Sequence, residues 1–119
     1  LRASGKPVIC SMGNVAASGG YMLAAACDSV FAQPTTITGS IGVIAGKVCI
    51  GGMLEKYGAH PETLAQVGKN AKAFSMLSEF TPEQAEQLDR SVHDMYEDFL
   101  GKVMAWRGLS YERVLTAAK

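Results

Sequence analysis

The chain has 119 residues, enough for one domain, and its composition of 48% hydrophobic and 18% charged residues is typical of a globular protein with a real core. Eleven basic and eleven acidic residues give a formal net charge of zero, so overall charge gives no reason to expect binding to nucleic acid or to an anionic membrane surface. The longest apolar stretches, residues 21–27 and 41–45, are far shorter than the roughly 18 residues of a membrane span. No signal-peptide pattern opens the chain, so any anchor or targeting segment is expected to lie outside it.

The first half of the chain alternates between predicted strand and helix. Residues 6–11 predict a short buried strand, and residues 18–27 predict an Ala-rich helix. Residues 29–33 predict a second strand, which Pro34 ends. These three segments form a predicted βαβ unit, and the Thr/Gly/Ser-rich residues 35–42 predict a turn that follows it.

The second half is predicted to be mostly helical. Residues 48–57 show helical spacing that Gly58 ends, residues 62–67 predict a further strand, and the polar residues 68–79 predict a loop. Alternating strands and helices with short connections predict an α/β layer fold with a mainly parallel sheet.

A long helix is predicted to follow this loop. Thr81, Pro82 and Gln84 form a capping box with proline at the first helical position. Apolar residues then recur at steps of three and four: Ala85, Leu88, Val92, Met95, Phe99 and Val103. Gly108 ends this helix, and a short helix is expected from Ser110.

The cysteines and histidines predict neither a disulfide framework, nor a metal site, nor a catalytic triad. The three cysteines, Cys10, Cys27 and Cys49, are odd in number and stand in apolar runs, which predicts buried thiols and no disulfide framework. We expect neither a metal nor a cofactor. His60 and His93 are predicted to be surface histidines, so no Ser-His-Asp triad is expected.

The most informative motif is Met12-Gly13-Asn14-Val15-Ala16-Ala17-Ser18-Gly19-Gly20-Tyr21, where a strand gives way to a helix. Ser18 at a helix N-terminus suits a nucleophile, because backbone N–H groups there have no intrahelical partner and can stabilise a developing oxyanion. Gly19 and Gly20 are expected to allow a turn that a Cβ atom would resist, and to let a bound peptide come close. The alternative is an ordinary N-cap serine followed by a close-packed glycine pair.

With Lys6-Pro7-Val8-Ile9 and Thr38-Gly39-Ser40-Ile41-Gly42-Val43, this motif resembles the core of the signal peptide peptidase A, or protease IV, family. The similarity continues through Leu54-Glu55-Lys56-Tyr57-Gly58, the Gly68-Lys69 loop and Thr81-Pro82-Glu83. It implies a ClpP/crotonase-like α/β fold in one partial peptidase domain over residues 1–119. It also implies hydrolysis of peptides, such as cleaved signal peptides, by a Ser-Lys dyad.

The resemblance assigns a role to three residues. Ser18 would be the nucleophile, Gly19 would lend its backbone N–H to the oxyanion hole, and Ser40 would hydrogen-bond and orient the base lysine. A serine hydroxyl needs a base within reach, and a lysine acts as one only when burial keeps its amine neutral. Taken alone, Ser40 in its Thr-Gly-Ser-Ile-Gly loop is typical of a turn serine.

The base itself is the main departure from the family pattern. The family's lysine lies three residues past a glycine, and counting from Gly68 gives Ala71, which cannot be a base. Lys69 and Lys72 flank it but are typical of solvated surface charges. Three explanations are open. The first is that the chain matches the second half of the tandem form, with the lysine supplied by a preceding domain or another subunit. The others are an inactivated variant and a loop shift that brings Lys72 inward. We favour the tandem form.

Further expectations concern the surroundings of the chain. The family's Ser-Pro-Gly-Gly segment would precede Leu1, so the chain is expected to be a fragment that is inactive alone. Members are usually membrane-attached, facing the bacterial periplasm or a plastid membrane, through segments not present here. Two other classes of protein remain open. The first is a non-catalytic assembly module, in which the apolar stripe of the long helix, with Trp106 nearby, faces a neighbouring subunit. The second is a crotonase-like acyl-CoA enzyme, which the nucleophile-like Ser18 between Ala17 and Gly19 argues against.

Overall fold

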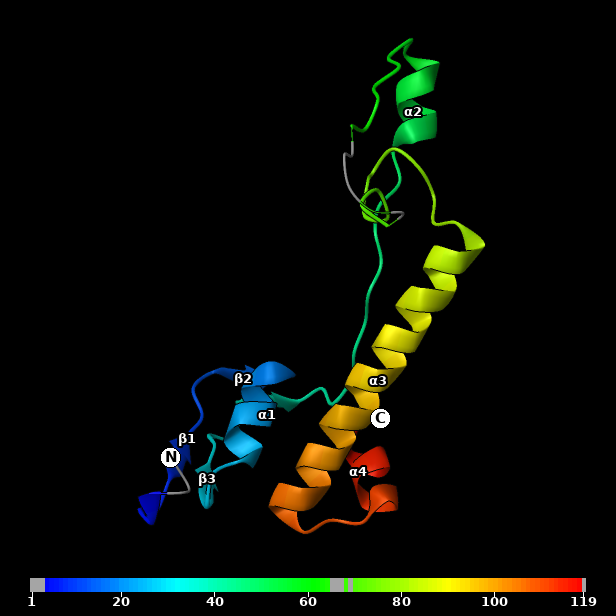
Figure 1. Ribbon diagram of the computed structural model, residues 1–119. Coiled ribbons are helices and arrows are strands. Elements are labelled where there is room, and N and C mark those ends of the chain that lie inside the picture. The colour runs from blue at the N-terminus through cyan, green and yellow to red at the C-terminus, as the bar shows by residue number, and fades with distance from the viewer. Residues whose placement is uncertain (1–3, 65–67, 69, 119) are drawn as a thin grey trace. The chain divides into compact units, whose positions relative to one another are not determined.

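The computed structural model describes residues 4–64, 68 and 70–118 (Figure 1). The chain divides into two compact units. The first unit comprises Leu1–Val43 and His93–Lys119, and the second unit comprises Ile44–Val92.

Two pairs of short parallel strands form the sheet portion of the first unit. Strand β1 (Ile9–Ser11) pairs with β3 (Ser29–Phe31), with Cys10 opposite Val30. Strand β2 (Val15–Ala17) pairs with β4 (Ile37–Gly39), with Ala16 opposite Thr38 and Ala17 opposite Gly39. Helix α1 (Gly19–Ala25) leads from β2 to β3, so the predicted βαβ unit and the α/β character are confirmed.

The prediction of a turn over residues 35–42 was wrong, and β2 was not predicted. Residues 37–39 form β4 rather than a turn, and β2 was read only as part of the serine motif. Both strands have three residues, Val-Ala-Ala and Ile-Thr-Gly, which is too short for a period-two pattern to appear. The prediction that the first strand is buried was also wrong, since Ile9 is 65% exposed.

Helix α3 (Pro82–Arg107) begins as predicted. The Thr81 N–H donates to Gln84 Oε1 at 3.0 Å, and the Gln84 N–H donates to Thr81 Oγ1 at 3.3 Å, which confirms the capping box. The pKa of the Glu83 carboxyl is lowered by hydrogen bonds from its own backbone and from the Thr81 side chain. The helix ends at Gly108, whose φ of 62° is left-handed.

The core of the first unit lies between α1, the C-terminal part of α3 and helix α4 (Tyr111–Ala118), which lies beside α3 in Figure 1. Its buried residues are Ala25, Ile41, Phe99, Leu100, Val103 and Val114. Trp106 packs against this cluster. Phe99 and Val103 from the predicted apolar stripe thus face the core, whereas Met95 is 50% exposed.

The second unit contains helix α2 (Gly51–Lys56), which is shorter than the predicted helix because residues 48–50 are not helical. Gly58, with a φ of 73°, follows the helix as predicted. Residues 62–64 of the predicted strand are not in a strand, and residues 65–67 lie outside the described residues. The loop predicted from residue 68 is confirmed wherever the structure describes it. A Cβ atom on Gly51 would lie 2.0 Å from the Leu77 carbonyl oxygen, so this contact requires glycine.

The prediction of buried cysteine thiols was wrong. Cys10 and Cys27 are half-buried and Cys49 is exposed. None of the described helices is long and apolar enough to cross a membrane.

Candidate active site

Ser18 is the single residue between strand β2 and helix α1, and its backbone is left-handed. Its φ is 52° and its ψ is −120°, a conformation that glycine adopts freely and that costs other residues on the order of 1–3 kcal/mol. The Ser18 N–H donates to the Gly39 carbonyl at 2.9 Å, and the Ser18 carbonyl accepts from the Met22 N–H at 2.9 Å. The β2–β4 pairing and the first turn of α1 therefore hold Ser18 in its strained conformation.

Ser40 also has a positive φ. It follows strand β4 directly and has a φ of 50°. Across the residues that the structure describes, Ser18 and Ser40 are the non-glycine residues with positive φ. They are also the two serines that the sequence motifs single out.

The sheet topology brings the two serines together. Because Ala17 pairs with Gly39 in parallel register, Ser18 and Ser40 each follow the carboxyl end of one of two adjacent strands. Neighbouring strands lie about 4.8 Å apart, and this edge of a parallel sheet is where α/β proteins bind ligands. Both residues are exposed there.

The Ser18 side chain does not act as a helix cap. Its hydroxyl makes no capping hydrogen bond to α1, so the N-cap alternative is not supported by the geometry. Gly19 is the first residue of α1, where a backbone N–H has no intrahelical acceptor. The nucleophile position thus combines a hydroxyl that does not cap the helix with a backbone donor from the next residue.

The expected role of the glycine pair needs correction. Neither Gly19 nor Gly20 has a positive φ, so the sharp turn is made by Ser18 itself. A Cβ atom on Gly19 would meet nothing within 4 Å, and one on Gly20 would only touch the Ala16 Cβ at 4.0 Å. The described chain therefore leaves open space beside Gly19, where a ligand can approach.

The lysines near the predicted base position lie in the second unit. Lys72 is exposed, Ala71 is an exposed turn residue whose N–H donates to the Gly68 carbonyl at 3.3 Å, and Lys69 lies outside the described residues. An exposed ammonium group is hydrated, which is the opposite of the dry environment that a lysine base requires.

Lys47 is a half-buried lysine that the sequence analysis missed. Its Nζ donates to the Ala73 carbonyl at 2.7 Å and lies 4.1 Å from the centre of the Phe80 ring. The Phe74 ring meets the Phe80 ring edge-on. These contacts engage the ammonium group in the packing of the second unit. The signal in the sequence was a lone lysine within the apolar residues 41–50.

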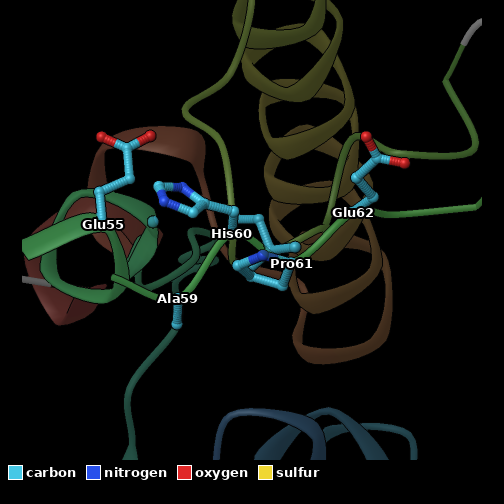
Figure 2. Close-up of a pocket in the computed structure, with 7 residues that line it drawn as sticks. Glu55, Ala59, His60, Pro61 and Glu62 are labelled. Atoms are coloured by element: carbon cyan, nitrogen blue, oxygen red, sulfur yellow. The ribbon is translucent and has the colours of Figure 1, made fainter. Parts of the chain in front are cut away.

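His60 lines a hollow of about 180 Å³ in the second unit. Figure 2 shows the His60 ring on the side of Glu55, with Glu62 on the far side of Pro61. His60 and His93 are both exposed, as predicted. No group of three or more His, Cys, Asp or Glu side chains suited to a metal ion occurs within the described parts of the chain.

Comparisons with known proteins agree with the sequence motifs. The family model "Peptidase family S49" matches residues 1–119. The chain is 36% identical over 120 residues to "Serine protease SPPA, chloroplastic" of Arabidopsis thaliana, which covers 100% of this chain and 18% of that protein. It is 32% identical over 113 residues to "Protease 4" of Salmonella typhi, covering 95% of this chain and 18% of that protein. It is 36% identical over 115 residues to "Protease 4" of Haemophilus influenzae, covering 96% and 18%.

The chain thus spans about a fifth of the length of these relatives. The resemblance to the signal peptide peptidase A family is confirmed by the names that these relatives carry. From the match over all 119 residues, the chain belongs to peptidase family S49.

Proposed function

We propose that this chain supplies the nucleophile of a serine peptidase, with Ser18 attacking the peptide carbonyl. The observation that carries the proposal is the strained backbone that Ser18 and Ser40 share at the carboxyl ends of adjacent strands. Strain of about 1–3 kcal/mol per residue persists only where the surrounding structure holds it, and such residues cluster at functional sites. A serine on a sharp turn between strand and helix is also how a nucleophile is exposed above a sheet in other hydrolases.

The geometry supports an acyl-transfer mechanism. The Ser18 Oγ forms a bond to the scissile carbonyl carbon while its proton passes to a base. The oxyanion of the resulting tetrahedral intermediate accepts a hydrogen bond from the Gly19 N–H. The C–N bond then breaks, the amine leaves with the proton, and water hydrolyses the acyl-enzyme by the same steps.

The base in this proposal is a neutral lysine that another domain or subunit contributes. Ala71 stands at the expected position and Lys72 is exposed, so a base from this chain has little support. Ser40 lies beside Ser18, and its hydroxyl is suited to orient the lysine amine while leaving that amine neutral. The unit to be tested is therefore a Ser-Lys dyad completed by a preceding tandem domain or by a second copy.

The substrate and surroundings follow from the family. We propose that the whole protein cleaves peptides such as signal peptides already released from their precursors. Its fold would be of the ClpP/crotonase type, and its location a bacterial inner membrane facing the periplasm or a plastid membrane. One relative carries the word "chloroplastic" in its name.

A non-catalytic assembly module is the second candidate. Ile9 and Phe31 on the β1–β3 pair and Val15 and Ile37 on the β2–β4 pair are each 63–66% exposed. Apolar groups on a sheet face usually pack against another layer. This candidate predicts no reactive serine.

Labelling with a fluorophosphonate separates the two candidates in the natural protein. We expect covalent labelling at Ser18, mapped by mass spectrometry, and no labelling of Ser18→Ala. Ser11→Ala is the matched control, because Ser11 is an exposed serine at the carboxyl end of β1 without a positive φ. Peptide hydrolysis by Ser18→Ala at the wild-type rate would remove Ser18 as the nucleophile.

A further inference from the structure

Thr38 makes a side-chain link between the two strands that carry the serines. It lies on β4 opposite Ala16 of β2. Its Oγ1 donates to the Ala16 carbonyl at 3.0 Å. The Met12 sulfur, a weaker acceptor, lies 3.5 Å from the same oxygen. Thr38 precedes Ser40 by two residues and Ala16 precedes Ser18 by two, so the link lies directly before both serines.

The β2–β4 pair is short enough for one extra hydrogen bond to matter. Each strand has three residues, and the Ser18 N–H to Gly39 carbonyl bond is the last backbone link before the site. The bond from the Ser18 N–H to Gly39 holds Ser18 in its costly backbone conformation, and Ser40, with its positive φ, follows Gly39 directly. A loosened pairing would let the strain relax and move the Ser18 hydroxyl.

Thr36 offers an internal comparison. Its Oγ1 donates to the Gly13 carbonyl at 2.9 Å and accepts from the Gln33 N–H at 3.1 Å. It therefore also links to a backbone carbonyl of the chain leading into β2, but ahead of both β2 and β4. Thr36 lies four residues before Ser40, just before β4, and its hydroxyl also accepts from the Gln33 N–H, whereas Thr38 lies on β4 two residues before Ser40.

We propose that Thr38 is a positioning residue, whose hydroxyl fixes the β2–β4 pairing so that Ser18 and Ser40 keep their strained backbones and mutual spacing. This inference rests on the proposed function of Ser18. Displacing a reacting group by about 1 Å can reduce a rate on the order of a hundredfold, so a distant hydrogen bond can control the reaction.

The test compares Thr38→Val, Thr38→Ser and Thr36→Val in the natural protein. Valine keeps the branched shape but has a methyl group in place of the hydroxyl, whereas serine keeps the hydroxyl and lacks the methyl group. We expect Thr38→Val to lower the phosphonate labelling rate of Ser18 and the kcat for peptide roughly tenfold to a hundredfold, with KM little changed. Thr38→Ser should restore both rates to within about twofold, and Thr36→Val should leave them at the wild-type level.

Hydrogen exchange at the Ser18 amide is a second measurement. It should become faster in Thr38→Val and not in Thr36→Val, because the first change loosens the pairing next to Gly39. If Thr38→Val fails to fold, Thr38→Ala against Thr38→Ser isolates the same hydroxyl.

The outcomes distinguish this inference from the proposed function. Wild-type labelling at Ser18 with an unchanged rate in Thr38→Val would overturn the role of Thr38 alone. Equal losses in Thr38→Val and Thr36→Val would also overturn it, because they would mark a general effect on stability. Absence of Ser18 labelling in the wild-type protein would overturn the proposed function, and the role of Thr38 with it.

Discussion

Replacing Ser18 by glycine should stabilise the first unit while abolishing catalysis. The φ of 52° and ψ of −120° cost a residue with a Cβ atom about 1–3 kcal/mol, and glycine avoids that cost. Glycine loses about 0.5–1 kcal/mol more backbone entropy on folding. The net expectation is a gain of about 1 kcal/mol in the free energy of unfolding.

Replacing Ser18 by alanine separates strain from capping. Alanine keeps the Cβ atom and hence the strain, and the lost hydroxyl makes no capping hydrogen bond. The free energy of unfolding should therefore change by less than about 0.5 kcal/mol. An N-cap serine would instead lose about 0.5–2 kcal/mol on the same change.

Urea unfolding followed by Trp106 fluorescence measures these differences. Trp106 is the one tryptophan of the chain and packs against the core of the first unit, so its signal reports that unit. Ser110→Gly is the control, because Ser110 precedes α4 without a positive φ and should gain nothing from glycine. A loss of stability in Ser18→Gly similar to that in Ser110→Gly, or a loss of 1 kcal/mol or more in Ser18→Ala, would refute the strain argument.

Four further changes test other parts of the account. Gly19→Ala should keep the stability of the chain, since its Cβ meets nothing within 4 Å, yet slow peptide hydrolysis by crowding the approach to the N–H donor; wild-type rates would contradict this. Gly51→Ala should speed hydrogen exchange across the second unit, and Gly52→Ala, whose Cβ has open space, should not. Lys72→Ala should leave hydrolysis unchanged, as for other solvated charges, and loss of activity would instead put the base within this chain. The pKa of Glu83 in the folded chain is below its ordinary 4.5, so its carboxylate stabilises the folded state above that pH, and this stabilisation is lost as the pH falls through the folded pKa. In an acid titration, Glu83→Gln should therefore lose less free energy of unfolding than the wild type.

Local signals in the sequence predicted those elements whose boundaries depend on local chemistry. The capping box at Thr81 and Gln84 and the glycine after Arg107 define α3 through contacts within a few residues. Strands β2 and β4 depend instead on pairing between residues 22 positions apart, as in Val15 with Ile37. A three-residue segment such as Val-Ala-Ala has no local sequence pattern that indicates its partner strand, so these strands could not be predicted.

The sequence motifs selected the residues of the candidate site but not their backbone conformation. The motifs identified Ser18 and Ser40, yet they attributed the sharp turn to Gly19 and Gly20. Serine has no intrinsic preference for a positive φ, so the strain at both positions is imposed by the surrounding fold and not by the residues themselves. The link made by Thr38 could not be predicted either, because its hydrogen-bond acceptor is a backbone carbonyl on another strand.

The exposure of the two serines has a consequence for the proposed mechanism. Exclusion of water lowers the pKa of a lysine and so favours its neutral amine near neutral pH, and it also strengthens hydrogen bonds to an oxyanion. Ser18 and Ser40 are exposed in this chain, so the dry environment has to come from whatever covers them. A domain or subunit that delivers the base would also deliver that cover, which makes the arrival of the lysine and the activation of Ser18 a single event.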